Sequence, residues 1–144
     1  MTQLYLPIAP FVVVRDGDPL AISIANRHYS RKKDTNRLCA SGKRLILVHP
    51  LGLWVFAWSL QKFRRDRQQG INCALFRNES EVLSSEIILM AEKEADEKFG
   101  RQRKFTYVNP AKVKSSNPGY CFQKAGWEKA GYSQKGLLLL IKNK

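Results

Sequence analysis

His28 lies in the sequence Asn26-Arg27-His28-Tyr29-Ser30 and is one of two histidines in the chain. The imidazole group titrates near neutral pH, so a histidine suits the abstraction of a proton from an amine. The alternative is a structural histidine near a helix end, whose ring bonds one of the last carbonyls. For His49, which ends a predicted strand before Pro50, we expect a structural role.

Ser84 and Ser85 stand directly before a segment with helical periodicity. A serine at a helix start caps the helix, because its oxygen accepts a hydrogen bond from a first-turn amide. The same helix start offers unpaired N–H groups and a positive dipole to a phosphate. The two roles are compatible, so we expect both capping and phosphate contact.

The charge of the chain is strongly positive and unevenly distributed. The net charge is +13, and seven of the twelve acids lie between Glu79 and Glu97. Basic residues gather instead in the segments 31–44 and 62–67. This segregation favours a surface that follows a phosphate backbone, with an ordinary solvated surface as the alternative. The predicted nucleic-acid contacts are Arg31, Lys32, Lys33, Arg64, Arg65 and Arg67.

Three aromatic residues, Trp54, Trp58 and Phe63, lie close to these basic segments. Chemistry on a base requires its removal from the stack, and such rings can hold an extruded base. Aromatic residues of a hairpin more often belong to the core, so a core position is the favoured alternative.

Several classes of protein are not indicated. Cys39, Cys73 and Cys121 form no C-x-x-C pair, so neither a metal site nor a disulfide framework is predicted, and a reducing compartment is expected. The N-terminus lacks a basic segment before its short apolar run, and no apolar run reaches the roughly 18 residues of a membrane span. We expect a cytoplasmic protein.

The residue patterns predict the order β, α, β, β, β, α, β, α, β in one domain, residues 1–144. The first helix begins at Pro19, with Asp18 as its cap, and runs for about 10 residues. Segments 44–50 and 53–61 form a hairpin, 71–78 is a strand, and 85–100 is a helix that ends at Gly100. Strand 105–110, a short helix or helix-turn over 117–131 and a final buried strand 136–142 follow. The fold class is a mixed α/β (α+β) sheet protein.

This order resembles the GNAT superfamily of N-acyltransferases over roughly residues 11–142. Within it, the chain resembles the phage Mom DNA-modification proteins. That likeness depends on NRHYS near the N-terminus, the serine-rich start of the main helix and the stretch NPGYCFQKAGW, residues 117–127. The resemblance implies a single GNAT-like domain with a mixed central sheet flanked by helices.

The resemblance implies acetyl-CoA, or another acyl-CoA, as the cofactor. The cofactor-binding residues that it implies are Phe76, Arg77, Asn78, Ser84, Ser85, Asn117 and Phe122. The pyrophosphate loop departs from the family pattern, because RNESEVLSS has no glycine and contains Glu79 and Glu81. Later in the chain, Gly126-Trp127 matches the segment that closes the cofactor cleft.

The resemblance also implies a mechanism without a protein nucleophile. Backbone N–H groups of strand 71–78 polarise the thioester carbonyl, and the amine of the acceptor attacks it. The predicted catalytic residues are His28, chosen for its titration range, and Asn117 and Tyr120, which the resemblance implies. For Asn117, which precedes Pro118, a simple turn role is the alternative. Phe122 occupies the usual tyrosine position, so Tyr120, Tyr132 or solvent protonates the leaving thiolate.

Three functional interpretations remain open at this point. The first is acyl transfer to a nucleic-acid base or a nucleic-acid-linked amine, with DNA or another nucleic acid as partner. The second keeps the chemistry but uses a small-molecule or protein amine. The third is a non-enzymatic nucleic-acid-binding domain on the same fold. No membrane partner is expected, and the oligomeric state is not predicted.

Overall fold

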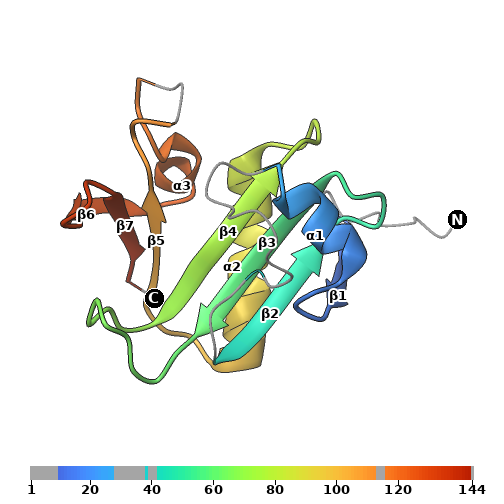
Figure 1. The fold of residues 1–144 in the computed structure, drawn as a ribbon, viewed down its shortest axis with the longest axis horizontal. Coiled ribbons are helices and arrows are strands. Elements are labelled where there is room, and N and C mark those ends of the chain that lie inside the picture. The colour runs from blue at the N-terminus through green and yellow to red at the C-terminus, as the bar shows by residue number, and fades with distance from the viewer. Residues whose placement is uncertain (1–9, 28–37, 39–41, 113–115, 144) are drawn as a thin grey trace, which may run out of the picture.

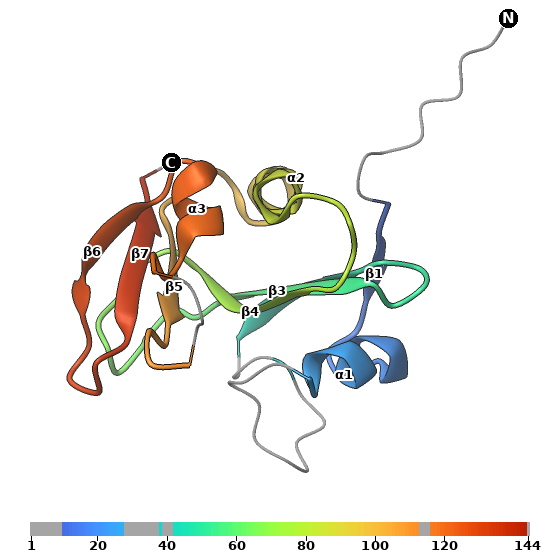
Figure 2. The ribbon, with the colours of Figure 1, turned by 90° about the horizontal axis from the view of Figure 1, so that it is seen from above.

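The computed structural model describes residues 10–27, 38, 42–112 and 116–143. All its strands belong to one seven-stranded sheet, in the order β1-β2-β3-β4-β5-β7-β6 (Figure 1). Figure 2 shows α2 and α3 on one face of this sheet and α1 on the other. The predicted mixed sheet flanked by helices is therefore confirmed over the described residues.

The first four strands form the antiparallel half of the sheet. They are β1 (Val12–Val14), β2 (Lys43–Val48), β3 (Trp54–Leu60) and β4 (Ile71–Asn78). Strands β2 and β3 form the predicted hairpin. In its turn, His49 Nδ1 accepts a hydrogen bond from the backbone N–H of Leu51 at 3.0 Å. This confirms the structural role expected of His49.

Helix α1 (Pro19–Ala25) begins as predicted but is shorter than expected, with 7 residues. Asp18 accepts hydrogen bonds from the amides of Leu20 at 3.1 Å and Ala21 at 3.2 Å, and Pro19 takes the first turn. The helix packs on the core between the sheet and α1, called the α1-side core. Its buried members are Ala21, Ile24, Ala25, Leu38, Ile46, Val48, Val55, Ala57 and Leu75.

Helix α2 (Ser84–Phe99) follows β4 and ends at Gly100, as the sequence predicted. It packs on the larger core between the sheet and α2, called the α2-side core. This core includes Trp54, Phe56, Trp58, Ile71, Cys73, Ile87, Ile88, Ala91, Phe122, Trp127, Leu138 and Leu140.

The remaining elements complete the sheet on the far side of β4. They are β5 (Lys104–Val108), α3 (Tyr120–Lys124), β6 (Glu128–Tyr132) and β7 (Leu138–Lys142). A short helix lies within the predicted segment 117–131, but the sequence did not predict β6, which forms an edge strand beside β7 at the end of that segment. All five residues of β6 are exposed, so no buried alternation marks it as a strand. The burial predicted for the last strand is confirmed at Leu138, Leu139 and Leu140.

Two lysines tie the C-terminal strands to acids of α2. Lys104 Nζ lies 2.7 Å from Asp96 Oδ1, and Lys142 Nζ lies 2.7 Å from Glu92 Oε1. Glu92 is buried, and its second oxygen accepts from Trp127 Nε1 at 3.2 Å. Part of the acidic side of α2 therefore stabilises the fold, because buried charges require such partners.

Candidate functional site

The parallel strands β4 and β5 are paired only at their beginnings. Ile71–Cys73 lie in register with Lys104–Thr106, and the Thr106 hydroxyl donates to the Cys73 carbonyl at 2.9 Å. The last five residues of β4, residues 74–78, have no described strand neighbour on the β5 side. Figure 1 shows the two strands diverging from this point. We call this divergence the splay. Open α/β sheets characteristically bind ligands outside the carboxyl ends of their strands.

A β-bulge at Ala74 re-aims the strand where the splay begins. Trp58 pairs with Cys73 and Ala57 with Leu75, so Ala74 has no partner on β3. Cys73 then faces the α2-side core, whereas Leu75 faces the α1-side core. In a regular strand these two residues would share a face, so the bulge reverses the alternation. Phe76 consequently packs on the α2 side of the splay.

Five aromatic rings close the α2 side of the splay in a continuous circuit. Phe76 lies against Phe122 of α3 with ring centroids 6.2 Å apart, and Phe122 lies 4.9 Å from Trp127. Trp127 stacks on Trp58 at 6.3 Å, and Phe56 joins Trp58 to Phe76 at 4.6 and 4.9 Å. The structure thus brings together Phe76 and Phe122, two of the predicted cofactor residues. Trp127 is a buried core residue in the described structure.

Asn78 organises the loop between β4 and α2. Its Oδ1 accepts from the backbone N–H and the hydroxyl of Ser80, at 2.9 and 2.6 Å. Its Nδ2 donates to the Val82 carbonyl at 2.8 Å and to Ser84 Oγ at 3.0 Å. These four bonds use the amide's capacity within the loop. Asn78 therefore positions the loop and has little capacity left for a ligand.

The start of α2 differs from the prediction for its two serines. Leu83 is the N-cap residue, and no side chain makes a capping hydrogen bond. Ser84 and Ser85 are instead the first two helical residues, so their expected role as caps is wrong. Ser84 Oγ accepts from Asn78, which leaves its own proton to donate. The helix start thus offers amide and hydroxyl donors, together with the positive end of the dipole.

Two arginines clamp Glu79, one of the acids that depart from the family pattern. Arg27 Nε lies 2.7 Å from Glu79 Oε2, and Arg77 Nε lies 3.0 Å from the same oxygen. The hydrogen bond from Arg27, followed by that from Arg77, lowers the pKa of Glu79. Two guanidinium groups thus contact one carboxylate, so this cluster carries a net positive charge. Glu81 and Glu86 remain as exposed acids of this segment.

The segment before α3 is fixed by its own hydrogen bonds. Asn117 Oδ1 accepts from Gln123 Nε2 at 3.1 Å, and the Asn117 carbonyl accepts from the amide of Tyr120 at 3.1 Å. A Cβ at Gly119, where φ is 78°, would lie 2.3 Å from Leu140 Cδ1, so this close approach requires glycine. Tyr120 exposes 54% of its surface.

No family model matches the sequence, and no curated protein matches it. Among solved structures, the chain is similar to a Bordetella pertussis protein provisionally described as a GnaT-family acetyltransferase. The identity is 14% and the TM-score is 0.49, over 69% of this chain and 64% of the other. The chain thus spans less than two thirds of that protein. At this level the likeness assigns neither an activity nor a substrate.

The predicted nucleic-acid contacts are only partly described. Arg31, Lys32 and Lys33 lie outside the described residues, as does His28, which was predicted as a catalytic residue. Arg64 is engaged within the protein: it forms a bidentate pair with Asp66 at 2.9 and 2.8 Å and lies 4.9 Å above the Phe105 ring. Arg65 and Arg67 are exposed.

The pair with Arg64 sets the protonation of Asp66. Its hydrogen bonds lower the pKa of the Asp66 carboxyl to about 2, assisted by donors from Gln68 and Tyr107. The carboxylate therefore stays charged throughout the neutral range and anchors the β3–β4 loop on β5.

The aromatic residues considered for base stacking separate into two groups. Trp54 and Trp58 are fully buried, whereas Phe63 exposes 85% of its surface. Trp58 Nε1 donates to the Ala91 carbonyl at 3.0 Å, but Trp54 Nε1 has no partner in the described structure. The tryptophans thus belong to the core.

The described residues contain no cluster of side chains suited to a metal ion, and none of their helices has the length and apolarity of a bilayer span.

Sequence reasoning missed residues whose partners are distant in the chain. Arg27 pairs with Glu79 from 52 positions away, and Gln123 fixes Asn117. It also missed the β6–β7 loop, residues 133–137. The polar, glycine-containing stretch Ser133–Gly136 between two strands was the available hairpin signal.

Proposed function

We propose that this chain is an acyl-CoA-dependent N-acyltransferase. The observation that supports this most is the β4–β5 splay, which opens beside the uncapped start of α2 on the same side of the sheet. An acyl thioester with an anionic carrier requires that combination: an open strand edge for its carbonyl and amide donors for its phosphates. The residues present fit such a carrier, because the α2 start has amide donors, the Ser84 hydroxyl and the nearby Arg77.

The chain's own groups have defined tasks in this reaction. Amides of β4 beyond Cys73 would polarise the thioester carbonyl, as an oxyanion hole does. The acceptor nitrogen bonds to the carbonyl carbon, the C–S bond breaks and the thiolate leaves. We assign the abstraction of the amine proton to His28 and the protonation of the thiolate to Tyr120. Asn117 would position α3 through Gln123. Phe76 and Phe122 would exclude water from the thioester.

For the acceptor, we favour a nucleic-acid base or a nucleic-acid-linked amine. The excess of 25 basic over 12 acidic residues supports a polyanionic partner, and the resemblance of three sequence motifs to those of Mom-like phage proteins favours the same class of partner. A cytoplasmic location remains part of this proposal. A small-molecule or protein amine is the second candidate, because Arg64, one of the predicted nucleic-acid contacts, is paired with Asp66 instead.

Acetyl-CoA binding tests the proposal. Acetyl-CoA at millimolar concentration should raise the melting temperature, because a ligand that binds only the folded state stabilises it. S-acetylpantetheine is the matched control: it has the same thioester but lacks the nucleotide and the pyrophosphate, so it should give a much smaller shift. No shift with either ligand would remove both enzymatic interpretations and leave the nucleic-acid-binding domain.

A further inference from the structure

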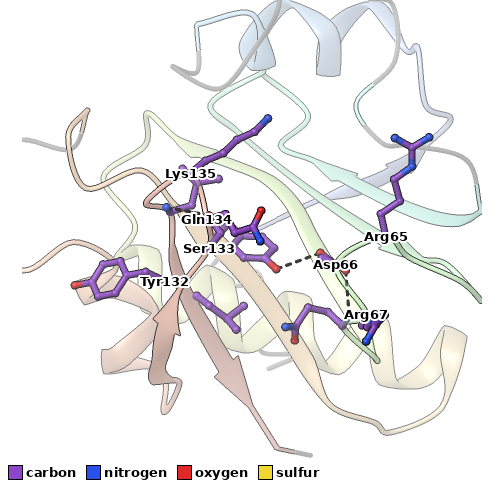
Figure 3. Close-up of a pocket in the computed structure, with 11 residues that line it drawn as sticks. Arg65, Asp66, Arg67, Tyr132, Ser133, Gln134 and Lys135 are labelled. Atoms are coloured by element: carbon purple, nitrogen blue, oxygen red, sulfur yellow. Dashed lines mark hydrogen bonds between the residues drawn. The ribbon is translucent and has the colours of Figure 1, made fainter.

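A cavity lies on the sheet face opposite α2 and α3. It has a volume of about 880 Å³ and lies between the β3–β4 loop and the β6–β7 loop (Figure 3). Its floor includes Tyr107 of β5 and Leu139 of β7. The neighbours Val108, Leu138 and Leu140 belong to the α2-side core, so these two floor residues face away from it.

Three cations line this cavity, and none of them has an ionic partner among the residues that the structure describes. They are Arg65 and Arg67 from the first loop and Lys135 from the second. The one acid in the lining, Asp66, is already saturated. Its Oδ1 accepts from Arg64 and Gln68, and its Oδ2 accepts from Arg64 and Tyr107. The cavity therefore presents uncompensated positive charge.

Two uncharged side chains that line the cavity also keep hydrogen-bond donors free for a ligand. Gln68 Oε1 accepts from Arg103 Nη2 at 2.9 Å, which leaves the Gln68 amide hydrogens for a ligand. Ser133 Oγ accepts from the Leu137 amide at 3.1 Å, which leaves the hydroxyl proton. Groups of this kind complement an anion rather than a cation.

The volume and the apolar floor of the cavity indicate a ligand that is larger than a bare anion. The Tyr107 ring, Leu137 and Leu139 provide apolar surface, and the volume is in the range of sites for small organic ligands. Arg67 also has a φ of 61°, a left-handed conformation that glycine or asparagine adopts with less strain. Strain of this kind is concentrated at ligand sites.

We propose that this cavity binds a nucleoside phosphate, either free or as the phosphorylated end of a single strand. The cations would hold the phosphate, and the apolar floor would hold the ring. The binding does not depend on acyl transfer. If the proposed acyl transfer holds, this ligand is the acceptor, and only that extension rests on the proposed function.

Calorimetric titration with deoxyadenosine 5′-monophosphate tests the inference. The nucleotide should bind at least tenfold more tightly than either inorganic phosphate or deoxyadenosine. The double variant Arg65→Gln/Lys135→Gln should weaken nucleotide binding at least tenfold. The matched control Lys93→Gln/Lys98→Gln removes two exposed charges from α2 and should change it less than twofold. Equal loss in both variants, or equal binding of nucleotide and inorganic phosphate, would overturn the proposal.

Two further measurements identify the source and separate this inference from the proposed function. A short single strand with a 5′-phosphate should bind more tightly than the same strand with a 5′-hydroxyl if strand ends are the ligand, whereas preference for the free nucleotide indicates a metabolite. Equal binding of both strands, together with no binding of the mononucleotide, would refute the cavity as the site. The stabilisation by acetyl-CoA should persist in Arg65→Gln/Lys135→Gln. Its loss there would place the nucleotide of CoA in this cavity and overturn the proposed site at the α2 start.

Discussion

Helices α1 and α2 begin in opposite ways. Asp18, at the start of α1, has φ −55° and ψ 130° and accepts from two first-turn amides. Leu83, at the start of α2, has nearly the same backbone, with φ −61° and ψ 131°, but cannot accept. The backbone thus suits a cap at both places, and only one helix has one. The α2 start therefore keeps its amide donors available beside the splay.

Among the variants considered, substitution of Leu83 should change stability and acetyl-CoA binding the most. Leu83→Asp copies the α1 start, and the new cap should stabilise the free protein by about 1 kcal/mol. The carboxylate would also occupy the place proposed for a phosphate. We expect acetyl-CoA to bind at least tenfold more weakly, which removes about 1.4 kcal/mol of its stabilisation at saturating concentration. Thermal melts with and without acetyl-CoA measure both changes.

Leu83→Asn is the matched variant, because it caps the helix without a negative charge. It should give a similar gain in the free protein and a smaller loss of acetyl-CoA binding. If acetyl-CoA stabilises both variants as much as the original protein, the phosphates do not bind at the α2 start.

Removal of the existing cap should have an intermediate effect. Asp18→Ala leaves the amides of Leu20 and Ala21 without their acceptor and should lower the free energy of unfolding by about 1 kcal/mol. Stabilisation by acetyl-CoA should not change, because α1 lies on the other face of the sheet. Urea denaturation checks the stability, and Asp18→Asn, which keeps an accepting oxygen, should lose less. A loss of acetyl-CoA binding in Asp18→Ala would show that the two helix starts are coupled.

The two helix starts also show what the sequence could predict. The Asp18-Pro19 pair was sufficient for the α1 cap, and apolar spacing was sufficient for β4 and most of α2. The serines were assigned as caps from residue type alone, whereas the true position depends on Asn78, which bonds to Ser84 Oγ and fixes the loop. A capping residue is decided by backbone geometry, which residue type does not specify.

The candidate site was less predictable than the elements around it. The resemblance assigned Phe76 and Phe122 to one site, and their rings lie 6.2 Å apart. The bulge at Ala74 that aims Phe76, however, leaves no mark in the residue pattern. The splay depends on where the β4–β5 register stops, which is a long-range property of the sheet. β6 was missed because all its side chains are exposed, so its sequence shows neither the alternation of apolar and polar residues nor the apolar run that marks a buried strand.

The smallest expected effect on stability concerns Glu79, which lies in the loop that leads to the α2 start. Glu79→Gln should leave the melting temperature of the free protein unchanged within error, because exposed ion pairs contribute little. It should, however, release Arg27 and Arg77, whose guanidinium groups now lie 2.7 and 3.0 Å from the carboxylate. We therefore expect stronger stabilisation by acetyl-CoA at low salt and less difference at high salt.

Glu81→Gln removes the same charge from the same loop without releasing an arginine, so it should produce a smaller gain. If Glu79→Gln instead weakens acetyl-CoA binding while Glu81→Gln does not, Glu79 serves to hold the two arginines in place for the phosphates. The open helix start would then depend on the clamp as well as on its amides.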